Sequence, residues 1–293
     1  IGSLAQARLR RGTAAKEPGV VFDYTTANGG TDFVFESDTT YYVSANAYFY
    51  GTTKVEGGAI IKYAPVDPNL NGTPRILVLG GLNCTTQPYR PAICTARDDD
   101  SVGEIISGST GNPGTNYYAF QAFLIWDSGS AVSAHDLRIS HAYYGFAAQY
   151  RQNVELRNSQ VIHSCYGAGS YVGSFATRNV LFQNFVYGLA AGGGAPIIGE
   201  NLTLSQGTQA ILNDSGSFAL TNCLVVAVGA TNGISGSNNE IVSTSNGVFQ
   251  SAGGGNHYLT ADSQRRNAGS TNENASLLSE LKSRTNLSTQ LAI

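Results

Sequence analysis

The chain is poor in charged residues: Asp, Glu, Lys and Arg make up 13% of its 293 residues, and the formal net charge is −3. It contains no methionine, one tryptophan and four cysteines. This weak, slightly acidic charge excludes the basic surface that nucleic-acid binding requires, so nucleic acid is not an expected partner. No apolar run approaches the roughly 20 residues of a membrane-spanning helix, so no membrane span is expected.

Glycine and aromatic residues are abundant instead, with 35 Gly, 16 Tyr and 12 Phe. Together with frequent Ser, Thr and Asn, this composition is typical of an all-β protein. The sequence begins with Ile1 and lacks Met, which we interpret as the loss of a leader from a secreted or cell-surface protein. A trimmed tag is the alternative.

A short unit recurs between residues 134 and 233. Each copy opens with a polar residue and then alternates apolar and polar side chains. The copies are residues 136–141, 153–158, 179–184, 201–206 and, more weakly, 217–222. A Tyr-Gly pair follows each of the first three copies, and the glycines, Gly145, Gly167 and Gly188, are 22 and 21 residues apart. A strand-rich repeat of this length predicts a solenoid.

The alternation also predicts which side chains point inward. A period of two sends one apolar pair of each copy to the same side. These pairs are Leu137/Ile139, Val154/Leu156, Val180/Phe182, Leu202/Leu204 and Phe218/Leu220. When the copies stack at the strand spacing of about 4.8 Å, the pairs form a continuous core that no single copy could bury.

The residue that ends each copy is polar. These residues are His141, Asn158, Asn184, Gln206 and Asn222. We interpret them as one column at a turn, a structural ladder in which stacked amides hydrogen-bond along the solenoid. Five unrelated surface residues are the alternative.

Three parts of the chain carry a resemblance to a known group. Residues 41–63, the Asn-Val-x-Leu copies within 153–206, and the closing segments 255–259 and 266–272 are similar to secreted right-handed parallel β-helix repeat proteins of the pectate-lyase-like superfamily, of the type found in planctomycetes and verrucomicrobia. The resemblance covers about residues 30–285. It implies an all-β fold, a right-handed parallel β-helix with an N-terminal cover and a short C-terminal helix. That superfamily contains lyases, hydrolases, adhesins and phage spikes, so the fold does not fix the function.

The remaining segments are organised around the solenoid. We expect an N-terminal arm at residues 1–20 and a single β-helix domain at residues 21–293. Residues 65–118 contain six of the eight prolines and predict a loop-rich insertion. Residues 272–285 predict a capped amphipathic helix that covers the last coil.

The insertion contains the candidate disulfide and the candidate metal ligands. Cys84 and Cys94 lie ten residues apart, and we predict a disulfide between them. Asp98, Asp99 and Asp100 are weak calcium candidates because calcium binds carboxylate oxygens, although a solvated loop is the favoured alternative. No other cofactor is expected.

The densest group of titratable residues includes Arg138, Arg157 and His163. If the chain is an enzyme, we expect a lyase or hydrolase of an acidic polysaccharide with these three residues near its site. A structural charge ladder is favoured instead, with Arg138 over Glu155 on an outer face. No pair of carboxylates of the kind that glycosidases use is evident, so a non-enzyme is expected.

Tyrosines cluster around the same three copies: Tyr143, Tyr144, Tyr150, Tyr166, Tyr171 and Tyr187. They are candidates for contact with a glycan or a neighbouring subunit, and filling of the solenoid corners is an equal alternative. We therefore expect an extracellular structural or adhesive protein. Its partners would be copies of itself, assembled into a filament if the contact does not close, or cell-surface polysaccharide.

Overall fold

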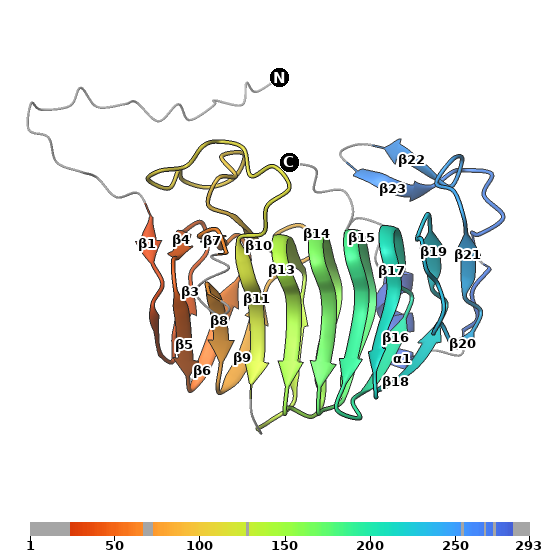
Figure 1. The fold of residues 1–293 in the computed structure, drawn as a ribbon, viewed down its shortest axis with the longest axis horizontal. Coiled ribbons are helices and arrows are strands. Elements are labelled where there is room, and N and C mark those ends of the chain that lie inside the picture. Colours follow the sequence, from red (N-terminus) through yellow and green to blue (C-terminus); the bar gives the residue numbers. More distant parts are fainter. Residues whose placement is uncertain are drawn as a thin grey trace, which may run out of the picture.

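The structure is a computed structural model that describes residues 24–66, 73–126, 129–252, 255–266, 268–271 and 274–283. These residues form a parallel β-solenoid of about nine turns with one short helix near the C-terminus (Figure 1). The predicted fold class is therefore confirmed. The expected N-terminal arm, residues 1–20, lies outside the described residues.

Each complete turn contributes a strand to each of three faces, which we name A, B and C. Every strand pairs in parallel with the strand of the same face in the next turn. The long strands β13 (Leu137–Gln149), β14 (Val154–Tyr171), β15 (Phe175–Gly192) and β17 (Thr203–Asp214) bend around corners and serve more than one face.

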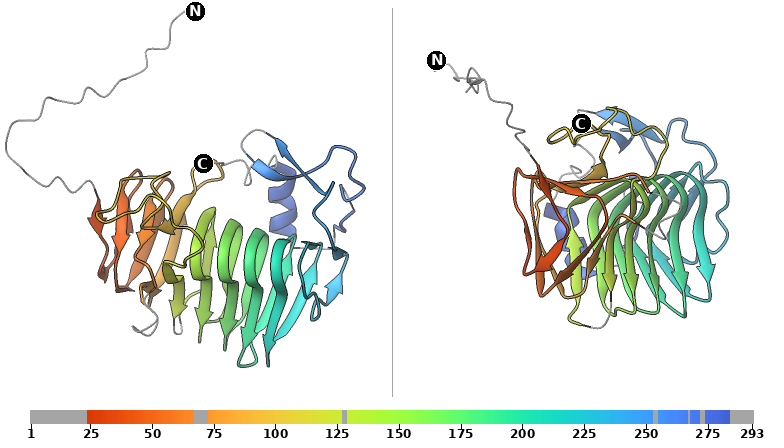
Figure 2. Two further views of the ribbon diagram at one scale, coloured as in Figure 1. Left: turned by 45° about the horizontal axis from the view of Figure 1, so that its top comes forward. Right: turned by 60° about the vertical axis from the view of Figure 1, so that its left-hand side comes forward.

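The shorter strands belong to single faces. Face A contains β1 (Thr25–Thr26), β4 (Thr40–Val43), β7 (Ile60–Tyr63), β10 (Ala92–Ala96), β19 (Leu224–Val226) and β21 (Glu240–Val242). Face B contains β2 (Gly29–Thr31), β5 (Asn46–Tyr50), β8 (Arg75–Val78) and β11 (Ala119–Trp126). Face C contains β3 (Val34–Phe35), β6 (Thr52–Glu56), β9 (Gly81–Thr85), β12 (Val132–His135), β16 (Pro196–Glu200), β18 (Ser217–Thr221) and β20 (Gly236–Ser237). Figure 1 looks onto face B, and Figure 2 shows the stack from two other sides.

The core runs along the inside of the three faces. The five predicted apolar pairs all contribute to it, because nine of their ten side chains are at most 2% exposed and the tenth, Phe218, packs against the same cluster. The period-two pattern thus predicts the buried side of each strand correctly.

Single residues in the left-handed conformation turn the chain at the corners. Between faces C and A these residues are Asp136, Asn158, Asn179, Asn201 and Asn222, with φ between 50° and 56°. Between faces A and B they are His141, His163, Asn184 and Gln206. Asn tolerates positive φ better than most residues, because its short side chain can bond the local backbone.

The predicted ladder of five residues is therefore divided between two corners, and its single-column register is wrong. The amide ladder of the C–A corner includes Asn179 and Asn201 instead: Asn179 Nδ2 donates to Asn158 Oδ1 at 2.8 Å, and Asn201 Nδ2 donates to Asn179 Oδ1 at 3.2 Å. The copies were misaligned because a left-handed Asn followed by an alternating strand occurs at two different corners, at Asn153 before face C and at Asn179 before face A.

Two segments lie over face A, toward opposite ends of the stack (Figures 1 and 2). Residues 97–118 cover the early turns, where the buried Lys62 Nζ donates to the carbonyl oxygens of Asp99 and Glu104 at 2.7 and 2.8 Å. The hairpin of β22 (Phe249–Ala252) and β23 (Gly255–Leu259) covers later turns.

The predicted C-terminal helix is present as α1 (Ala275–Ser283), capped by Asn274 Oδ1, which accepts from the backbone N–H groups of Ser276 and Leu277. The sequence analysis expects this helix to cover the last coil, but the structure places it elsewhere. Glu280 instead contacts Arg157 and Asn158 of β14, beside face C. No helix of the described residues is long and apolar enough to cross a membrane.

The predicted disulfide is wrong, because all four cysteines are free and buried. Cys84 points inward from β9 of face C, whereas Cys94 points inward from β10 of face A. The two cysteines thus belong to different faces although they are close in sequence. Burial raises the pKa of Cys84 to about 11 and that of Cys94 to about 12, so both stay protonated and unreactive.

Candidate functional site on face B

A column of stacked tyrosines runs along the outside of face B. Tyr144, Tyr166 and Tyr187 occupy the same position in three consecutive turns. The first two ring centroids are 4.3 Å apart with planes at 11°, and the next two are 4.9 Å apart at 27°. Because the ring faces are occupied by one another, these residues present ring edges and hydroxyl groups outward.

The glycine that follows each of these tyrosines has a packing reason. A Cβ atom on Gly167 would lie 2.5 Å from the carbonyl oxygen of Gly188 and 2.6 Å from the Phe182 ring. A Cβ atom on Gly145 would likewise lie 2.5 Å from the carbonyl oxygen of Gly167 and 2.5 Å from the Val161 side chain. The Tyr-Gly repeat thus places a large residue outward and no side chain inward at each turn, and the predicted interval of 22 and 21 residues matches the observed register.

A second aromatic row follows the edge of face B next to face C. Trp126, Gln149 and Tyr171 share one position in successive turns. Tyr150 lies at the corner, with its ring edge-on to Trp126 at 6.0 Å and to Tyr171 at 5.9 Å. Tyr150 and Tyr171 are 47% and 46% exposed, so about half of each side chain is available for contact with a ligand.

Small residues separate the two rows. Ala147, Gly169 and Ala190 occupy one position of three consecutive turns. A Cβ on Gly169 would lie 2.5 Å from the carbonyl oxygen of Ala190, so this position accepts no larger side chain without a backbone shift. We name the surface formed by the stacked tyrosines Tyr144, Tyr166 and Tyr187, the edge row Trp126, Tyr150 and Tyr171, and the small residues between them the aromatic platform.

The opposite margin of the aromatic platform is also aromatic. Tyr143 stacks on Phe120 at 5.5 Å, and Tyr117 lies 5.7 Å from Tyr143. Burial raises the pKa of Tyr143 to about 12. Its hydroxyl is therefore a neutral donor at physiological pH. All six tyrosines predicted as contacts thus lie on face B or at its corner.

The histidines His141 and His163 lie at the A–B corner in consecutive turns, with ring centroids 4.9 Å apart. Burial, and next the neighbouring His163, lower the pKa of His141 to about 4. His141 is therefore neutral near pH 7 and adds no charge to the margin of face B.

The three residues proposed for a lyase do not share a site. Arg138 lies on face A and donates through Nε to Gln160 Oε1 at 3.0 Å. Arg157 lies on face C, where it pairs with Glu280, and His163 lies at the A–B corner. The sequence analysis identifies these residues but assigns them to the wrong faces. It aligns residues 136–141, which form part of face A, with residues 153–158, which form part of face C.

The charge ladder exists on face C with different members. Arg178 pairs with both Glu155 and Glu200, and Glu155 Oε2 accepts from the Ser133 hydroxyl at 2.8 Å. The predicted pair of Arg138 over Glu155 is wrong, since Gln160 is the neighbour of Arg138. The ladder and the helix α1 both lie on the outside of face C, around Glu155, Arg157 and Arg178.

The three consecutive aspartates bond within their own loop. Asp98 accepts from Arg97 and from the Tyr118 hydroxyl, at 2.9 and 2.6 Å. Asp99 accepts from Thr95 at 2.7 Å, and Asp100 accepts from the Ser109 hydroxyl, also at 2.7 Å. These bonds direct the three carboxylates to different partners, and only the Thr95 bond of Asp99 joins the loop of residues 97–118 to β10 of face A. Among the described residues no group of three or more His, Cys, Asp or Glu side chains could hold a metal ion.

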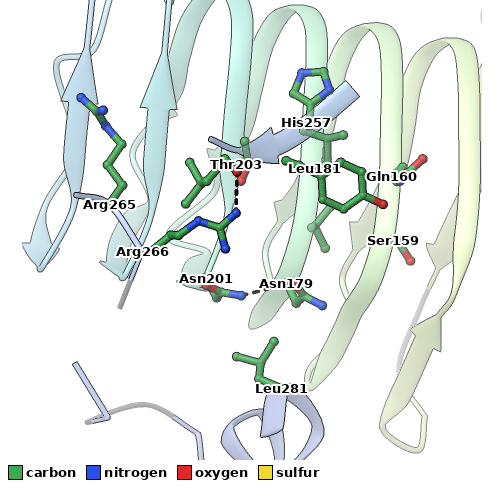
Figure 3. Close-up of a pocket in the computed structure, with 13 residues that line it drawn as sticks. Ser159, Gln160, Asn179, Leu181, Asn201, Thr203, His257, Arg265, Arg266 and Leu281 are labelled. Carbon is green, nitrogen blue, oxygen red and sulfur yellow. Dashed lines mark hydrogen bonds between the residues drawn. The ribbon is translucent and has the colours of Figure 1, made fainter. Parts of the chain in front are cut away.

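Two large cavities lie elsewhere, between the C-terminal segment and face A. Two adjoining cavities of about 460 and 690 Å³ share Asn201, Thr203, His257 and Arg265. Figure 3 shows the amides of Asn179 and Asn201 on one side and Arg266 on the other. Arg265 pairs with Glu240 at 2.8 Å, and Arg266 donates to the Leu259 and Thr260 carbonyls at 2.7 and 2.8 Å. The Arg265 pair attaches the C-terminal segment to β21, whereas the Arg266 bonds lie within that segment. We interpret the cavities as gaps beneath the segment.

Searches of protein-family models and of curated proteins find no match to this chain. The candidate site is therefore defined by its own geometry alone.

Proposed function

We propose that this protein is a polysaccharide-binding β-helix that holds an extended glycan on the aromatic platform and does not cleave it. The observation that supports this proposal most directly is the edge row. Its two half-exposed tyrosines, Tyr150 and Tyr171, lie on one side of the small residues of the aromatic platform. Aromatic rings supply large, rigid contact area, and the hydroxyls of the stacked tyrosines add donors and acceptors at each turn.

Absence of catalysis is supported by the composition of the face. A glycosidase needs two carboxylates across the scissile bond, and the described strands of face B contain a single one, Asp214. The alternative, a lyase or hydrolase of an acidic polysaccharide, requires Arg138, Arg157 and His163 to act together, although they occupy different parts of the solenoid. Release of unsaturated or reducing sugars by the purified protein would support that alternative.

The binding proposal can be tested on an array of immobilised polysaccharides. We expect the full chain to bind at least one of them and Tyr171→Ala to weaken that binding roughly tenfold, which is typical of an aromatic residue at the centre of an interface. Tyr89→Ala is the matched control, because Tyr89 is 67% exposed but lies in the turn between faces C and A. Equal losses in both variants would remove the argument for face B.

A second function, end-to-end association, is favoured by the last turn. Ile241 continues the inner row of Leu204 and Val225 but is 52% exposed. Among the described strands, β21 pairs with β19 only, so one strand edge is open. A second copy stacked on this end would bury Ile241 and extend the sheet. Light scattering tests this: wild type should show concentration-dependent mass, and Ile241→Lys should remain monomeric.

We further propose that the protein acts outside the cell or on its surface, where such polymers are found. Fractionation of the source cells with an antibody against the protein tests this location. Recovery of the protein in the cytoplasm would contradict it.

A further inference from the structure

Face B carries almost no charge. Its described strands contain one cation, Arg75, and one anion, Asp214. Asp214 lies at the exposed end of β17, beyond the tyrosine column. The Arg75 guanidinium is held within the face, since it donates to Asn46 Oδ1 at 3.1 Å and to Gln121 Oε1 at 3.0 Å and lies 5.2 Å from the centre of the Phe120 ring.

Among the described residues, the basic side chains at the corners of the turns that carry the aromatic platform are Arg151, His141 and His163. Arg151, at the corner with face C, is 1% exposed and donates to the carbonyl oxygens of Gly80 and Ser130 at 3.1 and 2.7 Å. His141 and His163, at the other corner, are half-buried, and their ring centroids lie 4.9 Å apart. The neutral donors and acceptors are the tyrosine hydroxyls and the side-chain amide of Gln149, which lies between Trp126 and Tyr171.

This distribution selects among polysaccharides by charge. A polyanion placed on the aromatic platform would lose hydration of its carboxylates without gaining a paired cation, which is unfavourable. Neutral hydroxyl groups, in contrast, can exchange water for tyrosine hydroxyls and amides at little cost. The two aromatic rows run parallel to the solenoid axis, so a chain lying along that axis contacts successive turns in the same way.

We propose that the ligand of the aromatic platform is a neutral polysaccharide lying along the solenoid axis, and that acidic polysaccharides are excluded. This inference rests on the proposed function of face B and names the class of its ligand. It differs from the sequence-based alternative, which assumed an acidic polymer.

Affinity gel electrophoresis of the full chain tests the inference. The probes are hydroxyethylcellulose, galactomannan and mixed-linkage β-glucan as neutral polymers, and polygalacturonate and alginate as acidic ones. We expect retardation by at least one neutral polymer, unchanged between about 0.05 and about 0.5 M salt, because screening affects only charged partners. Neither acidic polymer should retard the protein.

The variant Gln149→Arg sharpens the test by adding a cation within the edge row. We expect it to gain retardation by polygalacturonate that disappears at high salt, while Tyr89→Arg, with the same charge in a different place, should not. A gain in the first variant alone supports the inference. Equal behaviour of the two variants contradicts it.

The remaining outcomes separate the ligand class from the function. Retardation of wild type by an acidic polymer that is lost in Tyr171→Ala would overturn the neutral ligand and leave face B as the binding site. Acidic binding that Tyr171→Ala leaves intact would overturn both. Retardation by none of the polymers would overturn the proposed function itself.

Discussion

Faces B and C are built from the same turns and differ only in what they present outward. On the inside they are equivalent: Phe146 of face B and Phe175 of face C are at most 2% exposed, and their rings stack at 6.2 Å. On the outside, face B carries aromatic residues and small residues, whereas face C carries the Arg178 ion pairs and is partly covered by α1. The inner rows are therefore constrained by the fold, and the outer rows are free to differ in function.

The largest expected effect tests the equivalence of the inner rows. Phe146→Ala and Phe175→Ala should each lower the free energy of unfolding by about 3–5 kcal/mol, because each removes a fully buried ring from a packed core. Urea denaturation followed by circular dichroism measures both. Tyr171→Ala, on the outer side of face B, is the control and should cost about 0.5 kcal/mol or less. A clearly smaller cost on one face would show that the two inner rows are not equivalent.

The next effect tests the outer side of face C. Arg178→Met should cost about 1–3 kcal/mol, because it leaves Glu155 and Glu200 without their shared cation in a region where Arg178 is only 16% exposed. Lys54→Met is the matched control on the same face. Its pair with Glu56 is more exposed, at 37% and 27%, and should contribute about 0–1 kcal/mol. If both variants cost the same, the ladder on face C contributes nothing beyond ordinary surface pairs.

The sequence predicts much of this comparison, but not which face each residue belongs to. Period-two alternation identifies the inner residues, and the Tyr-Gly interval identifies the turn length, because both depend on local backbone geometry alone. Assignment of a copy to a face depends on which corner precedes it. Asn153 and Asn179 have the same left-handed conformation and are followed by similar strands, yet they begin strands of different faces.

The sequence aligns the tyrosines correctly, although it misplaces the charged residues, because the two alignments depend on different features. Tyr144, Tyr166 and Tyr187 lie at a fixed offset from the repeated glycines, so their alignment needs no knowledge of the corners. The residues of the platform that the sequence analysis missed are Trp126 and the small residues between the rows. Trp126 precedes the repeated copies and belongs to β11, whose pairing with β13 cannot be inferred from a pattern that begins later in the chain.

A smaller effect on stability distinguishes the C–A corner from the A–B corner. Asn179→Gly should cost about 1–2 kcal/mol, because it removes an amide that bonds to Asn158 and Asn201, at about 0.5–1.5 kcal/mol per bond. Asn184→Gly, at the A–B corner, should be nearly neutral, because glycine accepts the same left-handed conformation, φ 52°, and no ladder bond is lost. Thermal denaturation of both variants provides the comparison. Equal destabilisation would mean that the corners, unlike the faces, are interchangeable.

The smallest effect concerns pH at the margin of face B. Because the pKa of His141 is lowered from 6.5 to about 4 in the folded protein, the unfolded chain binds the proton more readily, and stability is lost as pH falls from about 6.5 through 4. We expect this contribution to be about 1 kcal/mol after allowance for partial exposure.

His141→Asn removes the titrating group and keeps a residue suited to the left-handed corner, as in Asn184 of a later turn. The difference between the urea midpoints of wild type and variant should therefore change between pH 7 and pH 4 in the variant's favour. The carboxylates of face C, which titrate in both proteins, cancel in that difference. A pH-independent difference would show that His141 is protonated as easily in the folded protein as in the unfolded chain, and the margin of face B would then carry charge in mild acid.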